Sequence, residues 1–315
     1  MNNSTASTST SCTYSYGDIS SISRYILGTG FVVCSILATT GSIISLIILQ
    51  KPSMRCKKSN KILSSLSTSD TLVGLGLCIV FTIQMLSEDL RSSCFLENTK
   101  NILAPWMIGT SSLNIALISY DRYVMLSSLT NYDIKMNKRR LYFLILSTWI
   151  TPILFFMTVF INRLLFMAAL ALFTIIPLII IIVAYCMVVK FVKKNSFVKE
   201  RSEGGQSSKN ENNRRLVQRL SVLVFCYFIC LLPLMVNFFW EIFNRLSKQE
   251  KSVTHQTLTV VGALCACVNS VLNPIIYFSK FPDFQREFRK MFGLRGNAVI
   301  ETNSTNNDTT SERVN

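Results

Sequence analysis

Charged side chains are scarce in this chain. Asp, Glu, Lys and Arg make up only 16% of its 315 residues, whereas hydrophobic residues make up 50%. Soluble globular domains carry about 25% charged residues. The composition therefore excludes an ordinary soluble domain and predicts a membrane protein, because only a bilayer accommodates apolar runs of this length.

Residues that catalyse reactions or bind transition metals are also scarce. His255 is the single histidine, and no nucleophile, base and orienting group fall at related positions. The thiol pairs Cys226 with Cys230 and Cys265 with Cys267 have no histidine or carboxylate beside them. Zinc sites and most catalytic sites combine such groups. We therefore expect no enzyme activity, no cofactor and no transition metal.

Seven apolar segments are long enough to cross a bilayer, which takes about 20 residues per helix. The first, fourth, fifth and sixth carry no formal charge, and the second and third each contain an acid, Asp70 and Asp121. The predicted fold is an all-α membrane protein, a seven-transmembrane helix bundle. The predicted spans are residues 25–50, 62–87, 101–125, 141–161, 164–189, 220–240 and 252–278.

Acidic residues are few, 17 against 32 Lys and Arg, and the basic residues are placed unevenly. Most of them follow the first, third, fifth and seventh spans, on the side that carries the C-terminus. The positive-inside rule places this side in the cytoplasm and the N-terminus outside. Because the cations lie at span ends, they favour contact with anionic membrane lipid over a nucleic-acid partner. We expect a multi-pass protein of the plasma membrane.

The predicted domains are an extracellular N-terminus (residues 1–22), a membrane domain (23–292) and a disordered cytoplasmic tail (293–315). The first twenty residues lack the apolar core of a cleavable signal peptide, so the first span is expected to act as the signal. Asn2 and Asn3 begin glycosylation sequons on the outer side. Cys12 and Cys94, the outward-facing cysteines, either form a bridge or stay free.

Two further segments on the cytoplasmic side differ in character. Residues 194–213 are rich in Lys, Asn, Ser and Gly, which predicts a flexible loop. Residues 282–292 place Phe284 and Phe288 on one face and Arg286 on another. That pattern predicts a short amphipathic eighth helix on the inner membrane surface.

Asp70 lies in the middle of the second span, where burying an unpartnered carboxylate is costly. Partners at a compatible depth are Ser111 in the third span and Asn269, Ser270 and Asn273 in the seventh. Hydroxyl and amide oxygens around one carboxylate suit a small hard cation such as sodium. A polar network with water, or a protonated Asp70, is the alternative.

Arg122 lies one turn inside the cytoplasmic end of the third span, beside Asp121. The N–H groups of its guanidinium can leave that carboxylate and donate to other acceptors when the bundle opens. Tyr185 and Tyr277 are candidate hydroxyl partners at this depth. The alternative is an arginine that extends to the membrane surface without a switching role.

Proline occurs inside the fifth, sixth and seventh spans, at Pro177, Pro233 and Pro274. Each removes a backbone hydrogen bond and promotes a kink. We interpret them as hinges. The alternative is that proline is simply common in membrane helices.

Taken in order, these motifs resemble the rhodopsin-like (class A) G-protein-coupled receptors over about residues 24–292. The resemblance implies a sodium pocket made of Asp70, Ser111, Asn269, Ser270 and Asn273. It also implies coupling to a heterotrimeric G protein, with arrestin and a receptor kinase acting on the tail. The activation switch that it implies comprises Asp121, Arg122, Tyr123, Tyr185, Tyr227, Pro233, Asn273, Pro274 and Tyr277.

The chain departs from the family pattern at positions that matter for switching. Leu231 stands where the family usually has Trp, Tyr227 where Phe is typical, and Ser112 where a branched apolar residue is usual. Asn213 replaces an acid that often holds the arginine of the third span. Glu97 stands where the family has a cysteine, so the usual disulfide cannot form.

The predicted ligand pocket is apolar. Ala104 stands where amine receptors carry an aspartate, which disfavours an amine ligand, and Cys267 stands where opsins carry the retinal lysine. A neutral or lipid-like ligand and a cationic peptide both fit, and the same residues also fit plain helix packing. The expected pocket residues are Ala104, Ile108, Ala169, Phe173, Leu231, Leu234, Met235, Phe238, Ala263 and Cys267, with Gln84, Glu88, Asn237 and Glu241 near the mouth.

We therefore predict a receptor that binds an extracellular small molecule or peptide and activates G proteins. A non-signalling decoy or partner receptor is the first alternative. A small-solute transporter is the second, and the apolar outer halves of the spans disfavour it.

Overall fold

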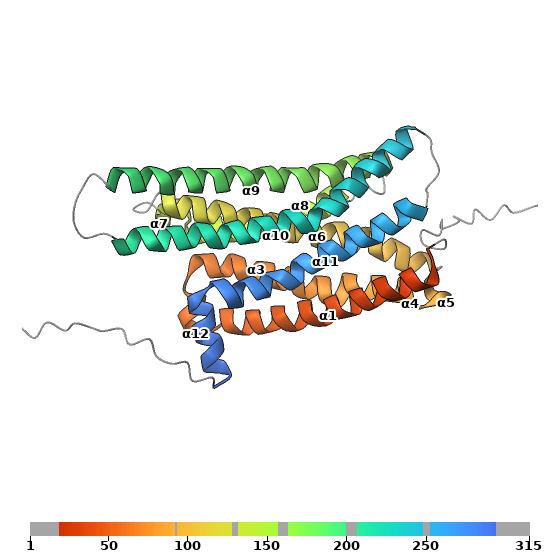
Figure 1. Ribbon diagram of the computed structural model, residues 1–315, viewed down its shortest axis with the longest axis horizontal. Helices are drawn as coiled ribbons and strands as arrows, with labels where there is room; N and C mark the ends of the chain where they lie inside the picture. The colour runs from red at the N-terminus through yellow and green to blue at the C-terminus, as the bar shows by residue number, and fades with distance from the viewer. Residues whose placement is uncertain are drawn as a thin grey trace, which may run out of the picture.

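Long helices run side by side along the length of the molecule (Figure 1). This computed structural model describes residues 19–91, 93–127, 132–156, 163–199, 207–247 and 253–293. Helices α7 and α12 mark one end of the bundle, on the left in Figure 1, and α5 marks the other. The elements are α1 (Ser21–Leu49), α2 (Pro52–Arg55), α3 (Lys58–Leu72), η1 (Val73–Leu77), α4 (Cys78–Leu86), α5 (Glu88–Arg91), α6 (Cys94–Ser127), α7 (Tyr132–Lys135), α8 (Lys138–Phe156), α9 (Arg163–Lys199), α10 (Ser207–Leu246), α11 (Val253–Lys280) and α12 (Pro282–Met291).

Each predicted span coincides with a long helix, so the all-α bundle is confirmed. Among the described residues, 6 helical stretches are long and apolar enough to cross a membrane. They lie in α1, in α3 to α4, and in α6, α9, α10 and α11. The predicted fourth span corresponds to α8, which is described as far as Phe156.

The second span is not one regular α-helix. After Leu72 it passes through the π-helical turn η1 before α4 begins at Cys78. The backbone approaches α1 closely here, because Ser35 Oγ donates to the Gly74 carbonyl at 2.7 Å and a Cβ on Gly74 would overlap the Thr39 hydroxyl. Such turns often occur at functional sites, and this one follows Asp70 within one helical turn. The hydropathy pattern did not predict it.

The prediction of a loop at residues 194–213 is wrong for most of these residues, because they are helical. Helix α9 continues to Lys199 and α10 begins at Ser207, and residues 200–206 lie outside the described residues. Adding residues to an existing helix avoids the cost of helix nucleation. Polar residues with only moderate helix propensity therefore extend the helices of the fifth and sixth spans. Figure 1 also shows that α10 bends in its second half, which contains Pro233.

Helix α12 turns away from α11 after Phe281, and Pro282 occupies its first turn, where no backbone N–H is needed (Figure 1). Phe284 is buried against Tyr277, with ring centroids 5.9 Å apart, whereas Arg286 is exposed. The predicted amphipathic helix is thus confirmed, with its aromatic face on the bundle.

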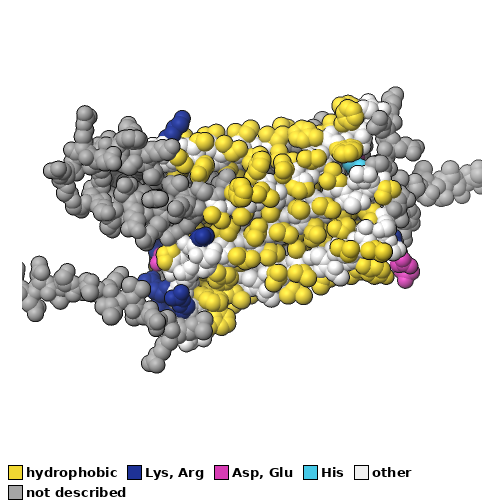
Figure 2. Space-filling model, viewed as in Figure 1, with side chains coloured by type: hydrophobic (Ala, Val, Ile, Leu, Met, Phe, Trp, Pro, Cys, Tyr) yellow, Lys and Arg dark blue, Asp and Glu magenta, His cyan; other side chains and the backbone are white. Residues whose placement is uncertain are grey.

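Hydrophobic side chains cover the outside of the bundle as well as its interior. Ile36, Phe143 and Phe225 are 57%, 70% and 64% exposed. Figure 2 shows such side chains along the length of the helices, with Lys and Arg gathered at the α12 end. An apolar surface this extensive is unfavourable in water, whereas a bilayer would cover it.

Candidate functional site

Asp121 joins three segments at the α12 end of the bundle. Its carboxylate is buried, Ser59 on α3 donates to Oδ2 at 2.6 Å, and Tyr132 on α7 donates to Oδ1 at 2.7 Å. Burial, followed by the neighbouring Asp121, raises the pKa of Tyr132 to about 12, so the phenol keeps the proton that it donates. Both carboxylate oxygens are therefore satisfied, and α3, α6 and α7 share one buried anion.

Arg122 makes weaker contacts than its neighbour. Its Nε lies 4.0 Å from Asp121 Oδ2, and its Nη1 lies 3.8 Å from Met125 Sδ. A thioether is a weak acceptor. The predicted ion pair of Asp121 with Arg122 is thus long, because Ser59 and Tyr132 occupy the carboxylate. The sequence analysis missed both hydroxyl donors.

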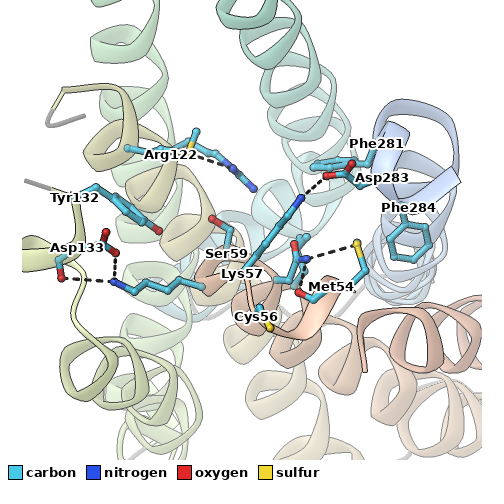
Figure 3. A pocket seen from close by; sticks show the side chains of 14 residues that line it. Met54, Cys56, Lys57, Ser59, Arg122, Tyr132, Asp133, Phe281, Asp283 and Phe284 are labelled. Atoms are coloured by element: carbon cyan, nitrogen blue, oxygen red, sulfur yellow. Dashed lines mark hydrogen bonds and ion pairs between the residues drawn. The ribbon is translucent and has the colours of Figure 1, made fainter. Parts of the chain in front are cut away.

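Arg122 also lines a cavity of about 490 Å³ at this end (Figure 3). The other cations of the cavity have close acid partners: Lys57 lies 2.5 Å from Asp283, and Lys58 lies 2.6 Å from Asp133. These pairs link the start of α3 to α12 and to α7. Exposed ion pairs contribute little stability each, but here they balance the charge of the cavity. Of the three described cations that line the cavity, Arg122 is the farthest from its acid partner.

Asp70 forms the second buried acidic site. It is fully buried, and Asn273 Nδ2 donates to its Oδ2 at 2.9 Å. Ser111 and Ser270 lie within interaction distance of the carboxylate. Among the described residues, however, Asp70 Oδ1 and the Ser111 hydroxyl have no hydrogen-bond partner. The structure therefore brings Asp70, Ser111, Ser270 and Asn273 together and leaves oxygen atoms unsatisfied. Asn269 is buried on α11, one helical turn before Asn273.

Two other predicted switch residues lie in the hydrophobic core. Tyr227 and Tyr277 are buried, and their hydroxyls have no partner among the described residues. The Tyr227 hydroxyl lies near Ser112, so two departures from the family pattern face each other. Tyr277 packs edge-on against Phe281 and does not bond to Arg122.

The remaining predicted switch residues lie on α6, α9, α10 and α11. Tyr123 and Tyr185 are half-buried on α6 and α9. Pro233 and Pro274 lie inside α10 and α11, as Pro177 lies inside α9. Their predicted roles as partners and hinges stay predictions.

Most of the predicted ligand-pocket residues pack in the apolar interior. Phe173 packs edge-on against Phe155, Met235 is half-buried, and the Ala169 side chain lies outside the described residues. This packing suits either a closed pocket or plain helix contact, so the pocket stays a prediction. The buried residues form two hydrophobic clusters, and Ile108 packs against both. One contains or contacts Leu231, Leu234 and Phe238, and the other contains or contacts Ala104, Ala263 and Cys267.

Charged side chains are buried near the α5 end. Lys100 is 6% exposed and pairs with Glu97 at 2.6 Å, and Gln84 Nε2 also donates to Glu97 at 3.2 Å. Glu241 on α10 and His255 on α11 are 3% and 2% exposed, with Oε2 and Nε2 3.2 Å apart. The sequence analysis missed the Lys100 and His255 pairings, because single charged residues near span ends usually lie at the membrane surface.

The predicted modification sites are only partly described. Asn2, Asn3 and Cys12 lie outside the described residues. Cys94 is disulfide-bonded, whereas the other described cysteines are free. The pairing of Cys94 with Cys12 stays a prediction.

Comparisons with known proteins agree with this architecture. The family model described as "7 transmembrane receptor (rhodopsin family)" matches residues 40–166 and 159–277. Neuropeptide Y receptor type 6 of Mus musculus is 24% identical over 296 residues, 82% of this chain and 77% of the relative. Bombesin receptor subtype-3 of Ovis aries is 27% identical over 118 residues, 37% of this chain and 30% of the relative. 5-Hydroxytryptamine receptor 6 of Mus musculus is 31% identical over 134 residues, 39% and 29% respectively.

Proposed function

Because the chain belongs to the rhodopsin family of seven-transmembrane receptors, we propose that it binds an extracellular ligand at the plasma membrane and activates heterotrimeric G proteins. Ligand binding would shift a pre-existing equilibrium toward a bundle that is open at the α12 end. The observation that carries this proposal is the loosely held Arg122 beside the fully bonded Asp121, facing a cavity at that end.

The charge distribution supports an orientation with the α12 end in the cytoplasm. Lys and Arg gather at that end in Figure 2, while Glu88 and Asp89 lie on α5 at the other. The positive-inside rule favours this placement. A G protein would then meet Arg122 and the segments around it. A receptor kinase and arrestin would act on the Ser- and Thr-rich tail through added phosphate charge.

The Asp70 cluster fits a sodium ion. Asp70 Oδ1 and the Ser111 hydroxyl are buried oxygens without a partner among the described residues, and hard cations prefer oxygen ligands. Asn269, Ser270 and Asn273 would complete the set. The ion would supply positive charge to the buried carboxylate, and these residues would hold it while the bundle stays closed.

A peptide is the ligand class that the outer end supports best. Lys100 with Glu97 and Glu241 with His255 place ionisable groups at this end that a peptide would meet. A relative that matches 82% of this chain is named as a neuropeptide receptor. A neutral or lipid-like ligand would use the apolar interior instead. Ala104 offers no carboxylate to an amine.

The test is G-protein dissociation in cells across G-protein subtypes, at baseline and with peptide, lipid and amine libraries. The native chain should give a signal that Arg122→Ala reduces at least tenfold at matched surface level. Arg139→Ala is the control, because Arg139 is exposed on α8 and should signal normally. Native-like signalling by Arg122→Ala would overturn the switch assignment. A native chain that reaches the surface and stays silent throughout would favour a decoy or partner receptor.

A further inference from the structure

A second hollow lies beside the bundle at the α12 end, between the end of α1, α2, α3 and α8. Its volume is about 630 Å³. Leu49, Ile145 and Trp149 are its largest apolar side chains, and among the described residues that line it Arg55 and Lys61 are the charged ones. We call this hollow the lateral groove.

The lateral groove differs in charge from the cavity at Arg122. There each lining lysine has an acid within 2.6 Å. Among the described residues, no acid lines the lateral groove and no carboxylate pairs with Arg55 or Lys61. Two cations without an acid partner make this groove a site for an anion.

Lys61 is positioned rather than free to move. Its Nζ donates to the Tyr142 hydroxyl at 2.6 Å and lies 4.6 Å from the centre of that ring. This contact uses one of three ammonium N–H groups, so the others remain to bind an anion. Arg55 is exposed at the same end, and its five donors suit a phosphate group.

The groove continues from this basic end toward the middle of the bundle. Thr68, another lining residue, is exposed and lies seven residues after Lys61, about 10 Å along the helix. Trp149 Nε1 donates to Ser65 at 3.0 Å, so its polar edge is satisfied and its ring faces remain as apolar lining. The lining away from the cations combines Leu49, Ile145 and Trp149 with uncharged polar residues such as Ser64 and Ser65. A molecule that is anionic at one end and uncharged along its length therefore suits the groove.

We propose that the lateral groove binds an anionic phospholipid of the cytoplasmic leaflet. Its phosphate contacts Arg55 and Lys61, and one acyl chain lies along Ile145 and Trp149. This inference rests on the membrane orientation in the proposed function. A sterol has no anion for the two cations, and a free phosphate would leave the apolar side chains uncovered.

The experiment is native mass spectrometry of the full chain released from nanodiscs of phosphatidylcholine with 10% phosphatidylserine. The native chain should retain phosphatidylserine in preference to phosphatidylcholine. Arg55→Gln with Lys61→Gln removes the charge-assisted hydrogen bonds to the phosphate and should lower retention at least about tenfold. Thr68→Trp, which fills the groove and keeps both cations, should also lower it. Arg139→Gln with Lys280→Gln removes equal charge outside the groove and should leave retention unchanged.

Three results would overturn the proposal. The first is equal retention of both lipids by the native chain, and the second is an equal loss in the control pair. The third is a combined result: millimolar glycerophosphoserine displaces the lipid, and Thr68→Trp does not change retention. That result would indicate a site for soluble phosphate. The readout does not need signalling. A silent receptor that still selects phosphatidylserine, or an Arg122-dependent receptor that does not, would separate the two proposals.

Discussion

Two aspartates are buried in this bundle, and they are satisfied to different degrees. Asp121 accepts from both Ser59 and Tyr132, one donor on each oxygen. Asp70 accepts from Asn273 on one oxygen, and the other has no partner among the described residues. A buried anion with every acceptor filled stabilises one arrangement of helices, whereas a buried anion with an open oxygen can accept a further ligand. Asp121 is therefore suited to hold the helices in one arrangement, and Asp70 is suited to bind an ion.

The largest effect is expected from Asp121→Asn. The substitution replaces a charged acceptor of two hydroxyl donors, and hydrogen bonds to charged groups contribute about 1.5–3 kcal/mol each. We expect the free energy of unfolding to fall by about 3 kcal/mol and basal G-protein dissociation to rise severalfold, because α3 and α7 lose their shared anion. Thermal unfolding in detergent and a basal signalling assay measure the two.

Asp133→Asn is the matched control for Asp121→Asn. Asp133 pairs with Lys58, and its side chain is 87% exposed, so its loss should cost less than about 1 kcal/mol. If the two variants lower the free energy of unfolding equally, the buried Asp121 contributes no more than the exposed pair of Asp133 with Lys58, which would contradict this prediction.

Asp70→Asn should have a smaller effect on stability and a selective effect on sodium. The new amide oxygen can still accept from Asn273, so the unfolding free energy should change by less than about 1.5 kcal/mol. Without the charge, sodium should no longer alter agonist binding, which a radioligand titration with and without sodium would measure. Asp121→Asn serves as the comparison and should keep its sodium response. Unchanged sodium sensitivity in Asp70→Asn would defeat the ion assignment.

Tyr132→Phe removes one of the two donors to Asp121 and should cost about 1 kcal/mol. Basal signalling should rise about twofold to fivefold, less than in Asp121→Asn. Tyr142→Phe is the control, because that hydroxyl also contacts a charged residue, Lys61, but lies on the lateral groove. If both phenylalanine variants raise basal signalling equally, Tyr132 does not act through Asp121.

The positions of the spans were predictable because length and hydropathy are local properties of the sequence. The predicted spans and the amphipathic helix match the observed helices within a few residues at most ends, apart from the extensions of α9 to Lys199 and of α10 back to Ser207. The pairing of Asp70 with Asn273 was also accessible, since a buried carboxylate requires a partner and Asn273 lies at a matching depth.

The donors to Asp121 were not predictable in the same way. Ser59 lies in the first turn of α3 and Tyr132 begins the short helix α7, 62 and 11 residues from Asp121 in the sequence. Both lie outside the predicted spans, where no periodic pattern fixes depth or direction. The π-helical turn after Asp70 was missed because its hydropathy equals that of an α-helix. The Glu241 contact with His255 required knowing how α10 and α11 pack.

The smallest effect concerns a third acid, Glu287 on α12, which lies at the periphery of the bundle. The hydrogen bond from Lys290 lowers the pKa of Glu287, and Lys51 lies 3.7 Å away on the connection after α1. A carboxyl group whose pKa is lowered by folding stabilises the fold above its unfolded pKa of about 4.3 and loses that contribution as the pH falls through the folded pKa. The attachment of α12 should therefore be constant from pH 7 to about 5 and weaken below about pH 4.

Hydrogen exchange of the α12 amides, corrected for the intrinsic effect of pH, would measure this loss. Glu287→Gln should show the weaker protection already at pH 7 and little further change on acidification, because Asp283 still pairs with Lys57 in both chains. If the native chain and the variant lose protection in parallel, then Asp283 or the bundle itself titrates, and Glu287 does not fasten α12. If only the native chain responds, the three acids differ in what they do. Asp121 holds α3, α6 and α7 together, Asp70 can bind an ion, and Glu287 attaches α12 without being needed for the bundle to fold.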